Sequence, residues 1–378
     1  MRSELTFALD DEQEALERTV KRLVDSPSTH EGLRRVVDNG GGHDAVAWAH
    51  LVELGLAGLT VEVSYGGSGL GDVELAVVCE QLGRGLVPTP YFATVALGAS
   101  ALRIAGDEVQ RHRFLPSLAS GARTATLAFL GGDRFTLEPA TSLSVTQVVG
   151  GYRLDGRLGF VLDGDTADLI VVRAGDGLFV LDTAILGPAE GLIRTRTPSL
   201  DMTRPLARLE LRGLVVPADT RLAVTASVAM PSIIHRAQIA LAAEQAGGAR
   251  RCLEMSVDYA KVRTQFGRPI GSFQAISHRC ADLMVEVETA RTAAWYGAFV
   301  GSTGSTDLEA VAALAASTCG AAFLKCAGEN IQIHGGIGFT WEHDAHLFYK
   351  RARASAALFG DAAWHADRYA ALLMGGGS

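Results

Sequence analysis

The feature that most constrains the fold is a set of long, alanine-rich helical patterns in the second half of the chain. The first pattern continues to Val262 and is more than twice as long as a typical globular helix of roughly 11–12 residues. Pro231 suits the first turn of this helix. Further helices are expected over Phe273–Gly301, over Asp307–Ile331 and from about Glu342 onward. Long helices joined by short loops predict a C-terminal four-helix bundle.

Two segments rich in glycine and polar residues interrupt these patterns. They are Arg263-Thr264-Gln265-Phe266-Gly267, with Phe273-Gln274 after it, and Gln332 through Phe339. Arg263 offers a planar, permanently charged fork that suits a pyrophosphate. Gly335 and Gly336 lack a Cβ, so a ligand or a partner backbone can approach closely. Gln274 and Gln332 can donate and accept hydrogen bonds toward a nucleotide. Taken singly, Arg263 could equally pair with a surface carboxylate, and the glycines could cap a helix.

The rest of the chain divides by the period of its apolar residues, which predicts an α+β protein. Residues 1–121 carry helical spacing, with a first amphipathic helix from Asp11-Glu12 and another helix over 72–82. Residues 122–220 predict a middle β-barrel or sandwich domain. Its short β-branched stretches are Ser144–Val149, Leu169–Arg173 and Leu178–Leu181. Residues 221–378 form the predicted bundle.

Composition excludes several classes of function. A net charge of −8 over 378 residues gives no general attraction to nucleic acid. No apolar run approaches the roughly 20 residues that a membrane span needs, and the acidic N-terminus is unlike a secretory signal. The five cysteines are scattered, odd in number and without CxxC spacing, which favours free thiols. We therefore expect a cytoplasmic protein without membrane or nucleic-acid partners.

The order helical, β, helical and the three segments Tyr65–Gly71, Arg263–Gly267 and Gln332–Phe339 resemble the acyl-CoA dehydrogenase family over essentially the whole chain. The resemblance implies FAD as cofactor, an acyl-CoA substrate, electron-transferring flavoprotein as acceptor and at least a dimer. In the family, the segments at Arg263–Gly267 and Gln332–Phe339 of one subunit hold the adenosine diphosphate part of FAD, while the flavin lies in the neighbouring subunit. The cofactor-binding residues implied here are Arg263, Phe266, Gln274, Gln332, Gly335 and Gly336.

The family chemistry is α,β-desaturation of an acyl-CoA thioester, in which a carboxylate removes the α-proton and a hydride passes from the β-carbon to flavin N5. The family places this base at one of two positions, which correspond here to Gly360 and Ala237. Asp361 lies beside the first position. Glu244 lies two helical turns beyond the second, on the same helix face. Glu244 could instead be a buried polar residue paired with an arginine, and the chain could lack a base altogether.

The middle domain also departs from the family pattern. The family loop that contacts flavin and substrate should fall at Leu127–Asp133, and its Trp-Ile-Thr segment at Gly159–Val161. Neither is present in this chain, whereas the segments used by the neighbour are intact. Leu86–Tyr91 resembles the actinobacterial steroid and fatty-acid group. Two hypotheses follow: an acyl-CoA dehydrogenase in lipid or steroid side-chain catabolism, or the non-catalytic partner of a heteromeric acyl-CoA dehydrogenase that completes its neighbour's FAD site.

Three other groupings point elsewhere, and each has a simpler interpretation. His343 and His346, with two acids beside them, have a spacing that metal ligands can use. The family interpretation makes this stretch the start of a helix, so no metal is predicted. Ser232, His235 and Asp282 are residue types that a hydrolase uses, but the sequence has no GxSxG elbow. The basic run Lys350–Arg353 is expected to be a solvated or interface face, or to contact a CoA phosphate.

Overall fold

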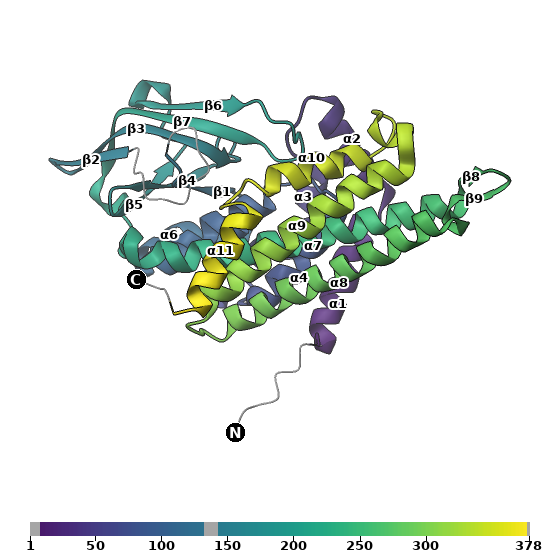
Figure 1. Ribbon diagram of the computed structural model, residues 1–378. Coiled ribbons are helices and arrows are strands. Elements are labelled where there is room, and N and C mark those ends of the chain that lie inside the picture. Colours follow the sequence, from purple (N-terminus) through teal and green to yellow (C-terminus); the bar gives the residue numbers. More distant parts are fainter. Residues whose placement is uncertain (1–7, 132–142, 376–378) are drawn as a thin grey trace. The chain divides into compact units, whose positions relative to one another are not determined.

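The computed structural model describes residues 8–131 and 143–375, and its chain forms two compact units (Figure 1). The first unit is helical and combines Met1–Glu31, Asp72–Val87 and Gln238–Ser378. The second unit combines Gly32–Gly71 and Pro88–Ala237 and holds the larger β-sheets. Segments far apart in the sequence therefore fold together within each unit.

The helical unit contains most of the long helices. They are α1 (Asp11–Val24), α4 (Asp72–Arg84), the main part of α7 (Ala226–Val262), α8 (Gln274–Ser302), α9 (Leu308–His334), α10 (Ala345–Ser355) and α11 (Ala362–Leu373). Asp10 begins α1 with a capping box, in which its side chain accepts from Gln13 N and Gln13 reciprocates. The α1 helix then buries Val20 and Val24, so the predicted first helix is confirmed.

The alanine and glycine content of α7 allows its neighbours to approach very closely. A Cβ added at Gly247 would lie 1.8 Å from the backbone oxygen of Glu80 in α4, and one added at Gly83 would lie 2.0 Å from that of Glu244. On other sides, Gly248 faces the ring of Phe323 in α9, and Gly297 of α8 faces Ile239. Small residues thus set the spacing at which α7 packs against α4, α8 and α9.

Buried polar groups fix the register of these helices. Glu80 is 2% exposed; it accepts from Arg291 Nε at 2.9 Å and from Trp295 Nε1 at 2.7 Å. Burial raises the pKa of the Glu80 carboxyl, and the nearby Arg291 charge opposes this effect. Ser256 of α7 donates to Asn330 of α9 at 3.0 Å.

The stretch Leu308–Phe339 is long and apolar enough to cross a membrane, but 56% of its most apolar window is buried inside the structure.

The second unit contains two main sheets. One has the order β1 (Ala125–Ala128), β4 (Leu169–Ala174), β5 (Gly177–Asp182), and the other β2 (Leu143–Val148), β3 (Gly151–Leu162), β7 (Leu206–Pro217), β6 (Leu192–Thr197). Side chains of both sheets, such as Leu154, Val172, Phe179 and Leu209, form one buried core. The three predicted strands correspond to β2, β4 and β5.

Helices complete the second unit. They are the end of α2 (Pro27–Asp38), α3 (Ala45–Glu53), the π-helix η3 (Phe92–Ala99), α5 (Ser100–Ala105) and α6 (Glu108–Ala119). The prediction for Pro231 was wrong, because α7 begins at Ala226 and the proline lies inside it, where one backbone hydrogen bond is lost. The division into domains 1–121, 122–220 and 221–378 stays a prediction.

Candidate functional site

The loop between α10 and α11 occupies the first position at which a base was expected. Gly360 has φ +107°, and an added Cβ would lie 2.7 Å from the Trp364 ring and 3.2 Å from His365 Nε2. Phe359 before it also has a positive φ, +61°. A side chain at residue 360 would therefore force the loop or both rings to move.

Asp361, the first stand-in for the base, is the N-cap of α11. Its Oδ1 accepts a hydrogen bond from Trp364 N at 2.8 Å, and its side chain is exposed. This bond satisfies one of the backbone donors that a helix leaves open at its start. The short side chain is thus held against its own helix.

Glu244, the second stand-in, is paired with an arginine inside the helical unit. Its Oε1 lies 2.8 Å from Arg351 Nη1, and the two side chains are 8% and 4% exposed. The pair links α7 to α10. Of the run Lys350–Arg353, which was expected to be a solvated or interface face, Arg351 is not solvated, because it pairs with the carboxylate of Glu244 in the interior. Lys350 packs 4.1 Å above the Trp341 ring.

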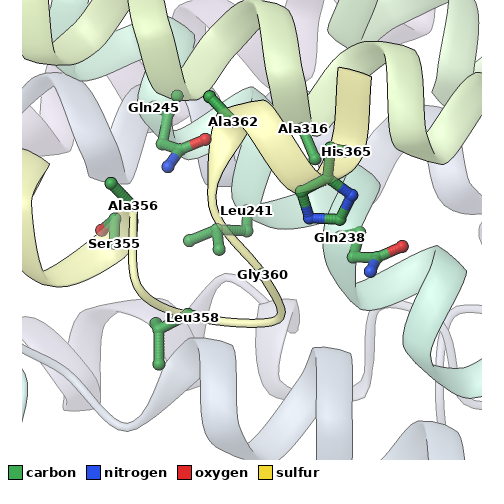
Figure 2. Close-up of a pocket in the computed structure, with 11 residues that line it drawn as sticks. Gln238, Leu241, Gln245, Ala316, Ser355, Ala356, Leu358, Gly360, Ala362 and His365 are labelled. Atoms are coloured by element: carbon green, nitrogen blue, oxygen red, sulfur yellow. The ribbon is translucent and has the colours of Figure 1, made fainter. Parts of the chain in front are cut away.

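A small cavity lies beside this loop (Figure 2). Its wall contains Gln238 and Gln245 of α7, Ser355 at the end of α10, Gly360 in the loop and His365 of α11. Gln238, the residue after the second expected base position at Ala237, donates to the backbone oxygen of Phe359 at 3.5 Å. Helix α7 and the loop therefore meet, with amide, hydroxyl and imidazole groups beside the two positions at which a base was expected.

The predicted cofactor residues lie at one end of the helical unit. The ring of Tyr259, one turn before Arg263, stacks on His334 with centroids 4.4 Å apart, which brings the ends of α7 and α9 together. Arg263 is exposed, and its backbone oxygen accepts from Ile270 N at 2.8 Å. This bond closes the hairpin of β8 (Thr264–Gln265) and β9 (Arg268–Pro269). Phe266 at its tip is 92% exposed and has φ +50°.

The glycine turn after α9 leaves its backbone open. Gly335 has φ +64°, and a Cβ added there or at Gly336 would meet no atom within 4 Å. Gln332 in the last turn of α9 and Gln274, the first residue of α8, are exposed. The structure thus brings Arg263 and the Gln332–Gly336 turn to neighbouring helix ends, with their polar groups accessible.

Two histidines brace the glycine turn. His334 Nδ1 lies 2.8 Å from the backbone oxygen of Asn330, so this nitrogen carries the hydrogen. His343 Nδ1 instead accepts from Ala345 N at 3.1 Å, and the two rings lie 4.3 Å apart. Among the described residues, no group of three or more histidine, cysteine, aspartate or glutamate side chains could hold a metal ion.

Comparison with known proteins decides the family. Acyl-CoA dehydrogenase, N-terminal domain, matches residues 10–122, and Acyl-CoA dehydrogenase, C-terminal domain, matches residues 226–374. The chain belongs to the acyl-CoA dehydrogenase family. Family members are oxidoreductases that act on CH–CH bonds, and they bind FAD. The predicted family and the predicted order of helical, sheet and helical parts are confirmed.

The similar proteins include mycobacterial acyl-CoA dehydrogenases. Acyl-CoA dehydrogenase IpdE2 of Mycolicibacterium smegmatis is 36% identical over 353 residues, which cover 93% of this chain and 96% of that protein. A chain of the ChsE4–ChsE5 complex from Mycobacterium tuberculosis is 27% identical with a TM-score of 0.89, covering 98% of this chain and 99% of that one. A variant of the Tcur3481–Tcur3483 steroid ACAD is 28% identical with a TM-score of 0.85, covering 97% and 98%.

Strained aromatic residues lie in three segments that were expected to contact the cofactor or the substrate. Phe160, Phe266 and Phe359 all have positive φ, which is rare for a bulky residue and clusters at functional sites. Phe160 lies in a bulge of β3, at the expected Trp-Ile-Thr position. Sequence reasoning missed this strain, although each phenylalanine has a glycine beside it. Of the expected loop at Leu127–Asp133, Leu127 and Ala128 belong to β1, and Gly132 and Asp133 lie outside the described residues.

The pair His334 and His343 is expected to make the folded protein less stable as the pH falls. Burial lowers the pKa of both His334 and His343 in the folded acyl-CoA dehydrogenase chain. The unfolded chain, with histidine pKa values near 6.5, then binds more protons. The stability that the neutral pair contributes is full above about pH 6.5 and falls as the pH drops toward the lowered pKa values. Thermal melts from pH 7.5 to 5.5 should show a falling Tm. His343→Gln should flatten that slope, and His278→Gln, at an exposed site on α8, should not.

Proposed function

We propose that this chain is the partner subunit of a heteromeric acyl-CoA dehydrogenase and contributes no catalytic base of its own. It binds the adenosine diphosphate part of FAD, and a related chain supplies the flavin pocket and the carboxylate. The observation that carries this proposal is the state of the candidate bases. Glu244 is held by Arg351 at 2.8 Å inside the protein, Asp361 caps a helix, and Gly360 has no room for a side chain.

The reaction explains why these three observations matter. Removing an α-proton from a thioester requires a carboxylate within hydrogen-bond reach of that proton. When bound, FAD accepts the hydride from the β-carbon. A carboxylate that binds a buried guanidinium must first give up that ion pair, which costs several kcal/mol of charge burial. The chain's own residues are therefore suited to binding the cofactor and not to proton transfer.

The residues at the helix ends fit the charged part of FAD. Arg263 can pair with the pyrophosphate through two parallel N–H bonds. The backbone at Gly335 and Gly336 is open to close approach, because no atom lies where a Cβ would project. The exposed amides of Gln274 and Gln332 and the exposed ring of Phe266 are available to the nucleotide. All of these groups face away from the interior, as a site completed by a second chain requires.

The known relatives support a two-chain enzyme. The ChsE4–ChsE5 structure is a complex, and Tcur3481–Tcur3483 is a steroid ACAD. Their likeness to this chain favours a steroid-derived acyl-CoA as substrate and a cytoplasmic heteromer that passes its electrons to an electron-transferring flavoprotein. The alternative, in which this chain alone desaturates an acyl-CoA, requires Glu244 or Asp361 to leave its present partner.

A test compares the chain alone with the chain co-expressed with a candidate partner, an acyl-CoA dehydrogenase from the same genome that carries the catalytic glutamate. We expect the chain alone to purify without stoichiometric FAD and to leave acyl-CoA thioesters unchanged in the presence of an artificial electron acceptor. The co-expressed complex should be yellow and active. Flavin absorbance, native mass and product analysis measure these outcomes. A yellow homo-oligomer that is bleached by acyl-CoA would overturn the proposal.

Arg263→Ala tests the cofactor role within the complex. Losing a charge-assisted pair of about 1.5–3 kcal/mol should weaken FAD binding roughly 10- to 100-fold. Arg18→Ala removes an arginine of α1 that forms an exposed ion pair with Glu14, and it should leave FAD content unchanged. Equal FAD content in both variants would contradict the assignment of Arg263.

A further inference from the structure

The cavity beside the α10–α11 loop is so small that its volume limits what can bind in it. About 10 Å³ of it is open to the centre of a water molecule, and this is room for a single water. A substrate, a cofactor fragment or a hydrated ion is too large. Part of the wall is apolar, formed by Leu241, Ala316, Ala356 and Leu358.

Buried polar side chains from three helices line this small space (Figure 2). Gln245 is 3% exposed, Ser355 1% and His365 2%, and they come from α7, α10 and α11 respectively. A buried water typically makes about three hydrogen bonds, within a range of two to four. The lining therefore offers the number and kind of partners that one water needs.

Gln245 is the lining residue whose side chain most needs a hydrogen-bond partner in the cavity. Its amide can donate two hydrogen bonds and accept others, yet among the described residues its side chain has no hydrogen-bond partner. Gly320 on the facing helix α9 leaves space against it, since a Cβ there would lie 3.7 Å from Gln245 Nε2. A buried amide without partners is costly, and a water in the adjoining cavity removes that cost.

We infer that this cavity is a binding site for one buried water molecule, which links Gln245 to Ser355 and His365 and holds the loop Leu358–Gly360 in place. The water acts on a loop whose Gly360 already lies against the rings of Trp364 and His365. It joins α7, α10 and α11 at the position where a base was expected. The inference does not depend on the proposed function.

A crystal structure at high resolution tests the site directly. The expected result is an ordered water within hydrogen-bond distance of the Gln245 amide and of Ser355 Oγ or a ring nitrogen of His365. A cavity without such a water, or a water that makes no bond to Gln245, overturns the inference.

Gln245→Met tests the linking role, because methionine keeps the length of glutamine and removes its hydrogen bonds. If the water links the three residues, Tm falls by roughly 2–4 °C and the amides of 358–365 exchange their hydrogens faster. If the amide is simply unsatisfied, Tm rises or stays unchanged, and the inference fails. Gln147→Met, at an exposed position of β2, controls for the chemical change itself.

Discussion

Arg351→Met is expected to lower the free energy of unfolding by about 3–5 kcal/mol, because it leaves the carboxylate of Glu244 buried without its partner. The side chain of Glu244 is only 8% exposed, so water cannot replace the lost charge. Denaturant unfolding monitored by circular dichroism measures the effect. An m-value equal to that of the unchanged protein would show that the surface exposed on unfolding is the same in both.

The matched control removes both charges. The double variant Glu244→Leu/Arg351→Met should regain most of the lost stability, since apolar residues of similar volume often replace a buried ion pair at little cost. Glu244→Gln bears on function, because the proposed partner subunit needs no base. In the co-expressed complex this change should leave kcat within about twofold, whereas a catalytic base contributes roughly 10²- to 10⁴-fold. A loss of that size would make Glu244 the base after all.

Gly247→Ala is expected to cost about 3 kcal/mol or more, although alanine is the better helix former. The new methyl group would lie 1.8 Å from the backbone oxygen of Glu80, and a backbone atom cannot rotate away. Helices α4 and α7 must separate to admit it, which disturbs the packing along both. Helix propensity alone predicts the opposite sign, a gain of about 1 kcal/mol. A lower free energy of unfolding in the variant would show that the close contact with Glu80 outweighs helix propensity, and a higher one would show the reverse.

Gly336→Ala is the control for this second prediction. No atom lies within 4 Å of a Cβ at Gly336, so the unfolding free energy should change by less than about 0.5 kcal/mol. If Gly247→Ala were equally harmless, the close crossing of α4 and α7 would be wrong.

The helices and strands could be predicted because their signals are local. The alanine-rich period of α7 and α9 and the β-branched runs of β4 and β5 are contained in the residues of each element. The breaks in the helical pattern at Arg263 and at Gly335-Gly336 are local signals too, and both lie at exposed helix ends; their role in binding the cofactor stays a prediction. Pro231 lies further inside α7 than the first turn in which it was expected, because the helix tolerates it there, which the local sequence does not reveal.

The state of the candidate bases could not be predicted, because it depends on residues distant in the sequence. Glu244 and its partner Arg351 are 107 positions apart. Pairing with an arginine was one of the alternatives for Glu244, but the sequence did not indicate which arginine. The positive φ of Phe160 and Phe359 and the crowding at Gly360 depend on tertiary contacts that leave no periodic pattern. The water-sized cavity could not be predicted either, because its wall is formed by residues from helices that are distant in the sequence.

The helical unit is assembled from both ends of the chain, and this has a consequence for its synthesis. Glu80 in α4 and Glu17 in α1 both bind Arg291, which lies 211 and 274 positions away. On a ribosome that adds roughly 5–20 residues per second, α4 waits about 10–40 s for its partner helix. During that interval the apolar faces of α1 and α4 are open to other nascent chains.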